Sequence, residues 1–409
     1  MDGAESVRLE PKDAEPTVRS VAERAFLKRR IDGQRNGKIQ VSAIARVRRD
    51  RPLPLSFAQQ RMWFLQELAP GNPFYNIPAA IPLNGEIDVA ALDAALNDIV
   101  RRHETLRTVF RRVDGEPRQI VLPFEHRSLD LIDLRGEGPA AERKLDMIAT
   151  EEAETPFDLG TGPPIRFRLV RTAALRQTLL LTIHHIAADG WSMGILFREL
   201  AELYEAHRAG REAKLPPLTI QYGDFAHWQR ERVSGASLDA LLAYWRGRLA
   251  GLNDMPLIAD RERPSIASFH GDFLDVTFDR PLTEAVRKLA RDHDCTLFQA
   301  ILAAFKAVLA RFSGTGDVVV GAPIANRVHP GLEPLIGFFV NSLVLRTDMS
   351  DDPPFAEILK RVRHCTIEAY AHQDLPFERL VQDLRPDRDL SRNPLFQVSF
   401  QIQNAPRIN

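Results

Sequence analysis

This chain of 409 residues has few cysteines, no long apolar run and almost no net charge. Its two cysteines, Cys295 and Cys365, are too few for a disulfide framework, so we expect two reduced thiols. Lys and Arg number 54 against 55 Asp and Glu, a balance that does not favour nucleic acid as a partner. No apolar run approaches the roughly 18–20 residues that span a bilayer, and the first residues lack the apolar core of a secretory signal. We therefore expect a cytoplasmic protein without membrane contacts.

The length of the chain and the pattern of its residues predict a lead segment and two lobes. A chain of 409 residues exceeds what one hydrophobic core usually organises. Residues 1–50 are polar and rich in Arg and Lys, which predicts a short helix and an extended linker ending at Pro52 and Pro54. We assign residues 51–225 to an N-terminal lobe and 226–409 to a C-terminal lobe.

Both halves alternate helical and strand patterns, which indicates an α/β fold. The predicted helices and strands, in chain order, are a helix in the stretch 88–110 with its apolar face at 92–103, strands 164–172 and 176–185, helix 190–210, strand 269–279, helices 281–293 and 296–314, and strands 316–327 and 338–348. Thr296 is the expected cap of the helix that follows it. The similar texture of the halves predicts two lobes of related architecture.

The segment "LTIHHIAADGWSMG" (181–194) carries the chemistry that stands out. His184 and His185 end a strand, so their side chains point to opposite faces and cannot share one substrate or metal. Asp189 and Gly190 follow on a tight loop, where glycine lets the backbone approach a ligand closely.

Three common chemistries are not supported by the residues around this segment. We find no third metal ligand at suitable spacing, no G-x-S-x-G elbow, and no cysteine in a basic setting. We therefore predict no metal site. The remaining interpretation is a single histidine that acts on a substrate with its own nucleophile. This chemistry is acyl transfer without a covalent enzyme intermediate.

Seven motifs in order resemble those of the condensation domains of nonribosomal peptide synthetases. They are "PLSFAQQRMWFLQEL" (54–68), "RRHETLRTVF" (101–110), "HHIAADG" (184–190), "YGDFAHW" (222–228), "IGFFVNSLVLR" (336–346), "HQDLPFERL" (372–380) and "RDLSRNPLFQVSF" (388–400). The resemblance implies two lobes similar to chloramphenicol acetyltransferase, arranged as a V-shaped pseudodimer with a substrate tunnel between them.

In this family a donor thioester and an aminoacyl acceptor are joined by an amide bond. The resemblance implies no bound cofactor, substrates carried on the phosphopantetheine of donor and acceptor peptidyl carrier domains, a neighbouring adenylation domain, and a monomer. An ordinary elongation domain and a starter domain that acylates the first amino acid from a fatty acyl-coenzyme A both fit. The residues 1–50 before the first motif suit a starter domain. A non-catalytic scaffold that recruits carrier proteins is a more remote alternative.

The resemblance also implies roles for individual residues. His185 matches the catalytic histidine, as a general base or as a group that positions the amine, and His184 is expected to orient the loop. Asp189 is expected to form a structural ion pair with Arg61, and Gly190 to bring a backbone amide near the substrate. Trp191, Ser192, Asn341 and Ser342 are expected along the tunnel, where Asn341 either bonds substrate or ties a loop.

Other histidines and the family subtypes receive simpler predictions. We expect His103 to be packed, His227 to lie on a helix surface beside a core Trp228, and His372 to be architectural. An "EGHGRE"-like segment typical of epimerisation domains is missing from 213–272, and both histidines stand where heterocyclisation domains have aspartates. The family continues beyond the last motif with strand and helix, so we expect the C-terminal lobe to be truncated and to expose a sheet edge.

Overall fold

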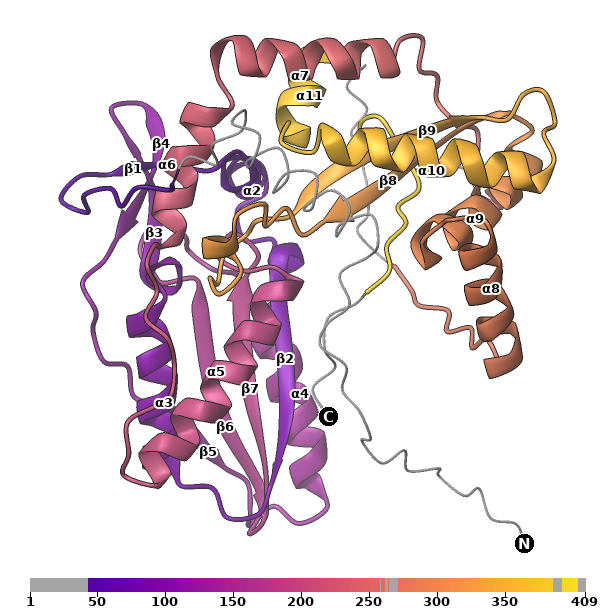
Figure 1. Cartoon of the computed structure of the whole chain (residues 1–409). Coiled ribbons are helices and arrows are strands. Elements are labelled where there is room, and N and C mark those ends of the chain that lie inside the picture. Colours follow the sequence, from indigo (N-terminus) through magenta and orange to yellow (C-terminus); the bar gives the residue numbers. More distant parts are fainter. Residues whose placement is uncertain (1–42, 258, 262–263, 265–270, 385–391, 404–409) are drawn as a thin grey trace, which may run out of the picture.

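The computed structural model describes residues 43–257, 259–261, 264, 271–384 and 392–403. Two lobes meet at an angle, and helix α7 (Gly235–Arg248) runs across the top of both (Figure 1). The loop between the two strands of the C-terminal lobe reaches back to the N-terminal lobe (Figure 1). The two lobes are therefore joined at the point where the site lies.

The N-terminal lobe holds a four-stranded sheet and a smaller three-stranded sheet. The strands are β1 (Leu53–Pro54), β2 (Asn76–Asn84), β3 (Thr108–Val113), β4 (Glu116–Val121), β5 (Asp130–Asp133), β6 (Ile165–Ala173) and β7 (Arg176–His184). The helices are α2 (Phe57–Leu68), α3 (Val89–Arg102), α4 (Ala140–Glu154), α5 (Gly190–Arg208) and α6 (Tyr222–Arg232), with short 3-10 turns at Pro73–Tyr75 and Glu104–Arg107. The larger sheet has the order β2-β7-β6-β5 and the smaller one β1-β4-β3.

Strand β7 lies inside the larger sheet, and its sequence shows why. Leu179, Leu181 and Ile183 alternate toward the core formed with α3 and α5, whereas Leu180 packs on the other face beside Val170 and α4. A strand covered on both faces reads as a continuous apolar run, as this one does. The run delivers the two histidines at its end.

The C-terminal lobe packs helices around a two-stranded antiparallel sheet. Its elements after α7 are α8 (Arg280–Asp292), α9 (Leu297–Ser313), β8 (Asp317–Ile324), a 3-10 turn (Pro330–Leu332), β9 (Asn341–Asp348), α10 (Phe355–Ala371) and α11 (Phe377–Leu384). Backbone bonds of 2.8 Å join Gly321 of β8 to Val398 and Phe400. Thr296 caps α9 as predicted, with its hydroxyl accepting from the Gln299 amide.

Most predicted elements are confirmed, but the predicted strand 269–279 is wrong for the residues that the structure describes, 271–279. These have no regular structure, and Phe273 is 96% exposed and Leu274 90% exposed. An alternating pattern forms a strand only when a neighbour takes up its backbone groups and covers its apolar face. No strand within the described parts of the chain does so here.

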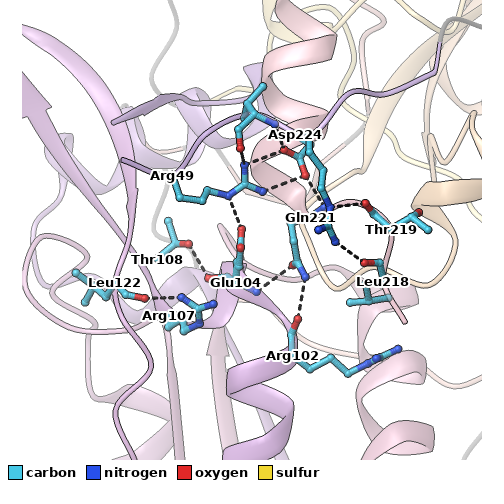
Figure 2. A network of polar contacts seen from close by, with 12 residues as sticks. Arg49, Arg102, Glu104, Arg107, Thr108, Leu122, Leu218, Thr219, Gln221 and Asp224 are labelled. Carbon is cyan, nitrogen blue, oxygen red and sulfur yellow. Dashed lines mark hydrogen bonds and ion pairs between the residues drawn. The ribbon is translucent and has the colours of Figure 1, made fainter. Parts of the chain in front are cut away.

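The part of the lead segment that is described, from residue 43 on, is docked rather than extended in solvent. Ile44 is buried, and the Arg46 guanidinium donates to the Thr219 and Leu218 carbonyls. Arg49 forms ion pairs with Asp224 of α6 at 2.8 Å and with Glu104 at 2.7 Å (Figure 2). Residues 43–50 therefore have no regular secondary structure, as expected for a linker, but they dock on the protein, while residues 1–42 lie outside the described part.

The Arg49 contacts belong to a wider polar network that fastens α6 to the N-terminal lobe. The Gln221 side chain donates to the Arg102 carbonyl at 2.9 Å and accepts from the Glu104 amide at 3.1 Å (Figure 2). The expected boundary at residue 225 falls inside α6. The polar network ties the start of α6 to the N-terminal lobe, whereas Arg232 at its end pairs with Asp374 of the C-terminal lobe at 2.7 Å. We therefore propose that the lobes divide after this helix.

The helices and the two cysteines of the described residues agree with a chain that has few cysteines and no long apolar run. No single helix among them is both long and apolar enough to cross a membrane, and the pair α8 and α9, which together have the length and composition, is bent by 103°. Cys295 and Cys365 are both free, as expected.

Lys306 of α9 is a fully buried lysine in the core of the C-terminal lobe. Its ammonium donates to the Leu345 carbonyl at 2.6 Å and to the Thr347 hydroxyl at 2.8 Å. Burial lowers its pKa from 10.5 to about 8, because the interior disfavours the charged form.

This shift predicts a pH-dependent stability difference between the wild type and Lys306→Met. Between about pH 8 and 10.5 the unfolded chain holds the lysine proton and the folded chain does not, so folding gains stability as pH rises. Relative to Lys306→Met, the unfolding free energy of the wild type should rise by about 3 kcal/mol across that window. Urea unfolding at pH 7.5 and 10 measures it. Lys288→Met, at an exposed lysine of α8, should show no such trend.

Candidate functional site

The catalytic loop is built between the end of β7 and the start of α5. The His184 amide donates to the Pro164 carbonyl at 3.0 Å and the His185 amide to the Tyr75 carbonyl at 2.8 Å. Asp189 then caps α5, and its carboxylate accepts from the Ser192 amide at 2.8 Å. Strand pairing and the helix cap thus fix both ends of the loop.

His184 faces the interior of the N-terminal lobe. Its Nδ1 accepts from the Ile186 amide at 3.1 Å, and its ring lies against Tyr75 and Phe157. Burial, with a smaller contribution from His185, lowers the pKa of His184 to about 3. The ring is therefore neutral at physiological pH and sits where it holds the turn that follows.

His185 points the other way and is only half-buried. Its Nδ1 lies 2.8 Å from the Ala188 carbonyl oxygen, which can only accept, so Nδ1 carries the ring proton. The lone pair of the neutral ring is consequently on Nε2, at the opposite edge. The Phe338 ring, from the C-terminal lobe, lies edge-on at a centroid distance of 4.7 Å.

Asp189 does not pair with Arg61, which corrects the sequence-based prediction. Its carboxylate binds Arg327 at 3.2 Å, and their side chains are only 1% and 3% exposed. The Ser192 hydroxyl lies 2.7 Å from the same carboxylate and accepts from Arg327 at 3.0 Å. Arg327 follows β8, so this buried pair joins the two lobes.

Arg61 lies on α2 and makes a different contact between the lobes. It pairs with Glu378 of α11 at 3.6 Å, and its guanidinium lies 5.6 Å from the centre of the Phe377 ring. The two charged side chains are 36% and 23% exposed. Solvent screens such a pair, so it is worth far less than the buried one.

The residues expected along the tunnel divide into exposed and buried ones. Gly190 is exposed and would leave an added Cβ in open space, while Trp191 is 44% exposed and its indole donates to the Glu333 carbonyl at 3.2 Å. Ser192 is fully buried in the joint with Gly337 and Arg327, so its expected place along a tunnel is wrong.

Asn341 ties a loop, which was one of its two expected roles. Its amide donates to the carbonyls of Gln373 and Leu375 at 2.9 and 2.8 Å, and its oxygen accepts from the Phe377 amide at 2.9 Å. Ser342, half-buried, follows it in β9 and also donates its amide to Asn341. The side-chain amide of Asn341 therefore fixes the turn before α11.

The remaining histidines have structural surroundings. His103 is buried, with Nε2 2.8 Å from Glu199 and Nδ1 accepting from the Ile336 amide. His227 pairs with Glu231 on the surface of α6 beside the buried Trp228. His372 stacks on Tyr244 with centroids 3.5 Å apart. The predicted placements of His103 and His227 are confirmed, and the architectural role of His372 stays a prediction.

Sequence reasoning missed two partners that complete the site. Glu199, whose carboxylate contacts Nε2 of His103, lies on the buried face of α5. Arg327, which pairs with Asp189, is the last residue of the "ANR" turn after β8. A charged residue at a position that the helical pattern buries was the available signal for Glu199. Within the described residues no group of His, Cys, Asp or Glu could hold a metal ion.

The two lobes are thus joined beside a half-buried histidine whose ring proton is fixed on Nδ1. The family model for the condensation domain matches residues 50–407, so the chain belongs to the condensation-domain family of nonribosomal peptide synthetases. The chain is 46% identical over 369 residues to malpinin synthetase of Mortierella alpina, covering 89% of this chain and 5% of that protein. It is 43% identical over 360 residues to phosphinothricin tripeptide synthetase PhsC of Streptomyces viridochromogenes, covering 87% and 33%.

Solved structures agree on the fold. The X-domain from teicoplanin biosynthesis matches with a TM-score of 0.79 and 33% identity, covering 87% of this chain and 79% of that one. The starter condensation domain of rhizomide synthetase RzmA in complex with C8-CoA matches with a TM-score of 0.71 and 24% identity, covering 85% and 77%. The chain has the two-lobed, chloramphenicol-acetyltransferase-like fold of condensation domains. It spans a small part of the synthetases it matches.

The buried and the partly exposed ion pair between the lobes, Asp189–Arg327 and Arg61–Glu378, predict mutational losses of different size. Arg327→Met strands the buried Asp189 charge and should lower the unfolding free energy by about 3–5 kcal/mol. Arg61→Met removes a partly exposed pair and should cost less than about 1 kcal/mol. Urea unfolding of both variants tests this.

A double variant separates charge from packing at the same joint. Asp189→Asn combined with Arg327→Met removes both buried charges and should recover part of the lost stability. Equal costs for Arg61→Met and Arg327→Met would contradict the assignment of the Asp189 partner.

Proposed function

We propose that this chain forms an amide bond by attack of a carrier-bound aminoacyl amine on a donor acyl or peptidyl thioester. The observation that carries the proposal is the half-buried His185, whose Nδ1–H is committed to the Ala188 carbonyl. This hydrogen bond leaves Nε2 as the acceptor edge of the ring, and the exposed start of α5 at Gly190 follows at the end of the same loop. Family membership supports the same chemistry.

The reaction needs a proton acceptor. An α-amine has an unperturbed pKa of about 7.7–8.0 and attacks only as the free base. As the new N–C bond forms, Nε2 of His185 accepts a proton from that nitrogen, and the C–S bond of the tetrahedral intermediate then breaks to release the thiol, which receives a proton. A hydrogen bond from the amine to Nε2 also orients the attack. No bond to the enzyme forms.

The start of α5 supports the developing oxyanion. The Gly190 amide is the first of a 19-residue helix, whose N-terminal end favours negative charge. Because Gly190 has open space on its Cα side, a substrate oxygen can approach the backbone there. Asp189 takes no part as a dyad partner, since its carboxylate is bound by Arg327, Ser192 and the Phe339 amide.

The partners of the proposed reaction are donor and acceptor peptidyl carrier domains and a neighbouring adenylation domain. The relatives are multidomain synthetases of which this chain matches one small part, which supports carriers as partners. The elongation reaction uses a peptidyl or aminoacyl donor on a carrier, and the starter reaction uses an acyl-coenzyme A. The intact histidine loop favours either over a non-catalytic scaffold.

His185→Gln should lower the rate of condensation by about 10²–10⁴-fold, because it removes the proton acceptor. The intact mass of the acceptor carrier, followed in time, measures product. The matched control is His227→Gln on the surface of α6, which should keep the wild-type rate. Full activity of His185→Gln would disprove the assigned role.

The donor class is tested by offering the domain two kinds of donor with one aminoacyl-loaded acceptor carrier. We expect product from an aminoacyl-loaded donor carrier, which identifies an elongation domain. Product only from a panel of acyl-coenzyme A donors would identify a starter domain instead and would overturn the elongation assignment. In both arms His185→Gln should slow the appearance of the mass shift by the factor given above.

A further inference from the structure

Residues Ile336–Phe339, here named the crossing segment, belong to the C-terminal lobe but pack on the N-terminal one. They lie between the 3-10 turn at Pro330–Leu332 and strand β9. Ile336 and Phe338 are buried in the same hydrophobic cluster as β7, α3 and α5. In Figure 1 the loop that contains them extends from the C-terminal lobe over the N-terminal one.

Each residue of the crossing segment is held by a polar contact to the N-terminal lobe. The amides of Ile336, Gly337 and Phe339 donate to His103 Nδ1 at 3.3 Å, Ser192 Oγ at 3.0 Å and Asp189 Oδ2 at 3.0 Å, and the Phe338 carbonyl accepts from the Tyr222 hydroxyl at 2.6 Å. Burial raises the pKa of Tyr222, so its hydroxyl keeps the proton that it donates.

The backbone of the crossing segment has no room to shift toward α6. A Cβ added at Gly337 would lie 2.0 Å from a ring carbon of Tyr222, so only glycine fits at this close approach. The backbone on either side of Phe338 is therefore fixed in place, and so is the base of the Phe338 side chain.

Phe338 connects this fixed backbone to His185 through a contact between the two rings. A single hydrogen bond from Nδ1 to the Ala188 carbonyl holds one edge of the imidazole but leaves the ring free to tilt about that bond. The Phe338 ring meets the imidazole at 4.7 Å with the planes inclined by 62°, an edge-to-face contact that restricts the tilt. Phe338 is itself buried, so it has little freedom to yield.

We propose that Phe338 is a positioning residue, which holds the imidazole of His185 in the orientation that presents Nε2 to the substrate. Its effect on rate rests on the proposed function, whereas its effect on the ring does not. The C-terminal lobe thereby sets the geometry of a histidine that belongs to the N-terminal lobe.

Phe338→Leu tests the proposal because it keeps an apolar side chain and removes the aromatic edge. It should lower kcat about three- to tenfold, as expected for loss of an aromatic pair, with KM for the loaded acceptor carrier unchanged. Phe338→Tyr keeps the ring and should restore kcat. The matched control, Phe110→Leu, lies in the same buried cluster and should change stability without changing kcat.

The imidazole itself supplies a second readout that does not depend on turnover. In the full chain with 15N-labelled histidine, the His185 ring nitrogens should show the Nδ1–H tautomer in the wild type and in Phe338→Leu, because the Ala188 carbonyl fixes it. In Phe338→Leu the His185 ring signals should shift and broaden, because the ring tilts more freely without the aromatic contact. His185→Gln assigns the signals. An unchanged His185 spectrum, or a rise confined to KM, would overturn the proposal. Activity retained in His185→Gln would overturn the proposed function and leave the spectral test standing.

Discussion

The buried ion pair between Asp189 and Arg327 is the contact on which the site depends. The same carboxylate caps α5, receives the Ser192 hydroxyl and accepts from the amide of Phe339. One side chain therefore sets the start of the helix that follows the catalytic loop and the position of the other lobe. Because two charges are almost completely removed from water, neither can be lost without leaving the other unpaired.

Because Asp189 is bound to Arg327, a different group orients His185. A carboxylate bound to the second nitrogen of a catalytic histidine would fix the tautomer and also stabilise the protonated ring. Here a backbone carbonyl, that of Ala188, fixes the tautomer instead, and the carboxylate in the same loop is committed to Arg327. The loop thus separates orientation of the histidine from the joining of the lobes, although one short stretch of chain contains both functions.

Local features of this fold could be predicted from the sequence, and long-range partners could not. The apolar run of β7, the helix after Asp189 and the cap at Thr296 follow from patterns within a few residues. The partner of Asp189 lies 138 residues away, and nothing in the sequence distinguishes Arg327 from Arg61 as its counterion. The wrong prediction of a strand at 269–279 also depends on a long-range partner. Alternation of apolar and polar residues is compatible with a strand, but the strand forms only if another strand pairs with it, and the segment itself does not show whether one does.

Two of the ion pairs between the lobes differ in the stability that is lost when each is broken. At the catalytic loop the joint is buried, charged and reinforced by the backbone bonds of residues 336–339. At α2 and α11 the pair between Arg61 and Glu378 is longer and partly exposed to solvent. An interface of this kind keeps the catalytic histidine in one environment even where the outer contact is broken, since the stabilising free energy is concentrated beside the loop that carries it.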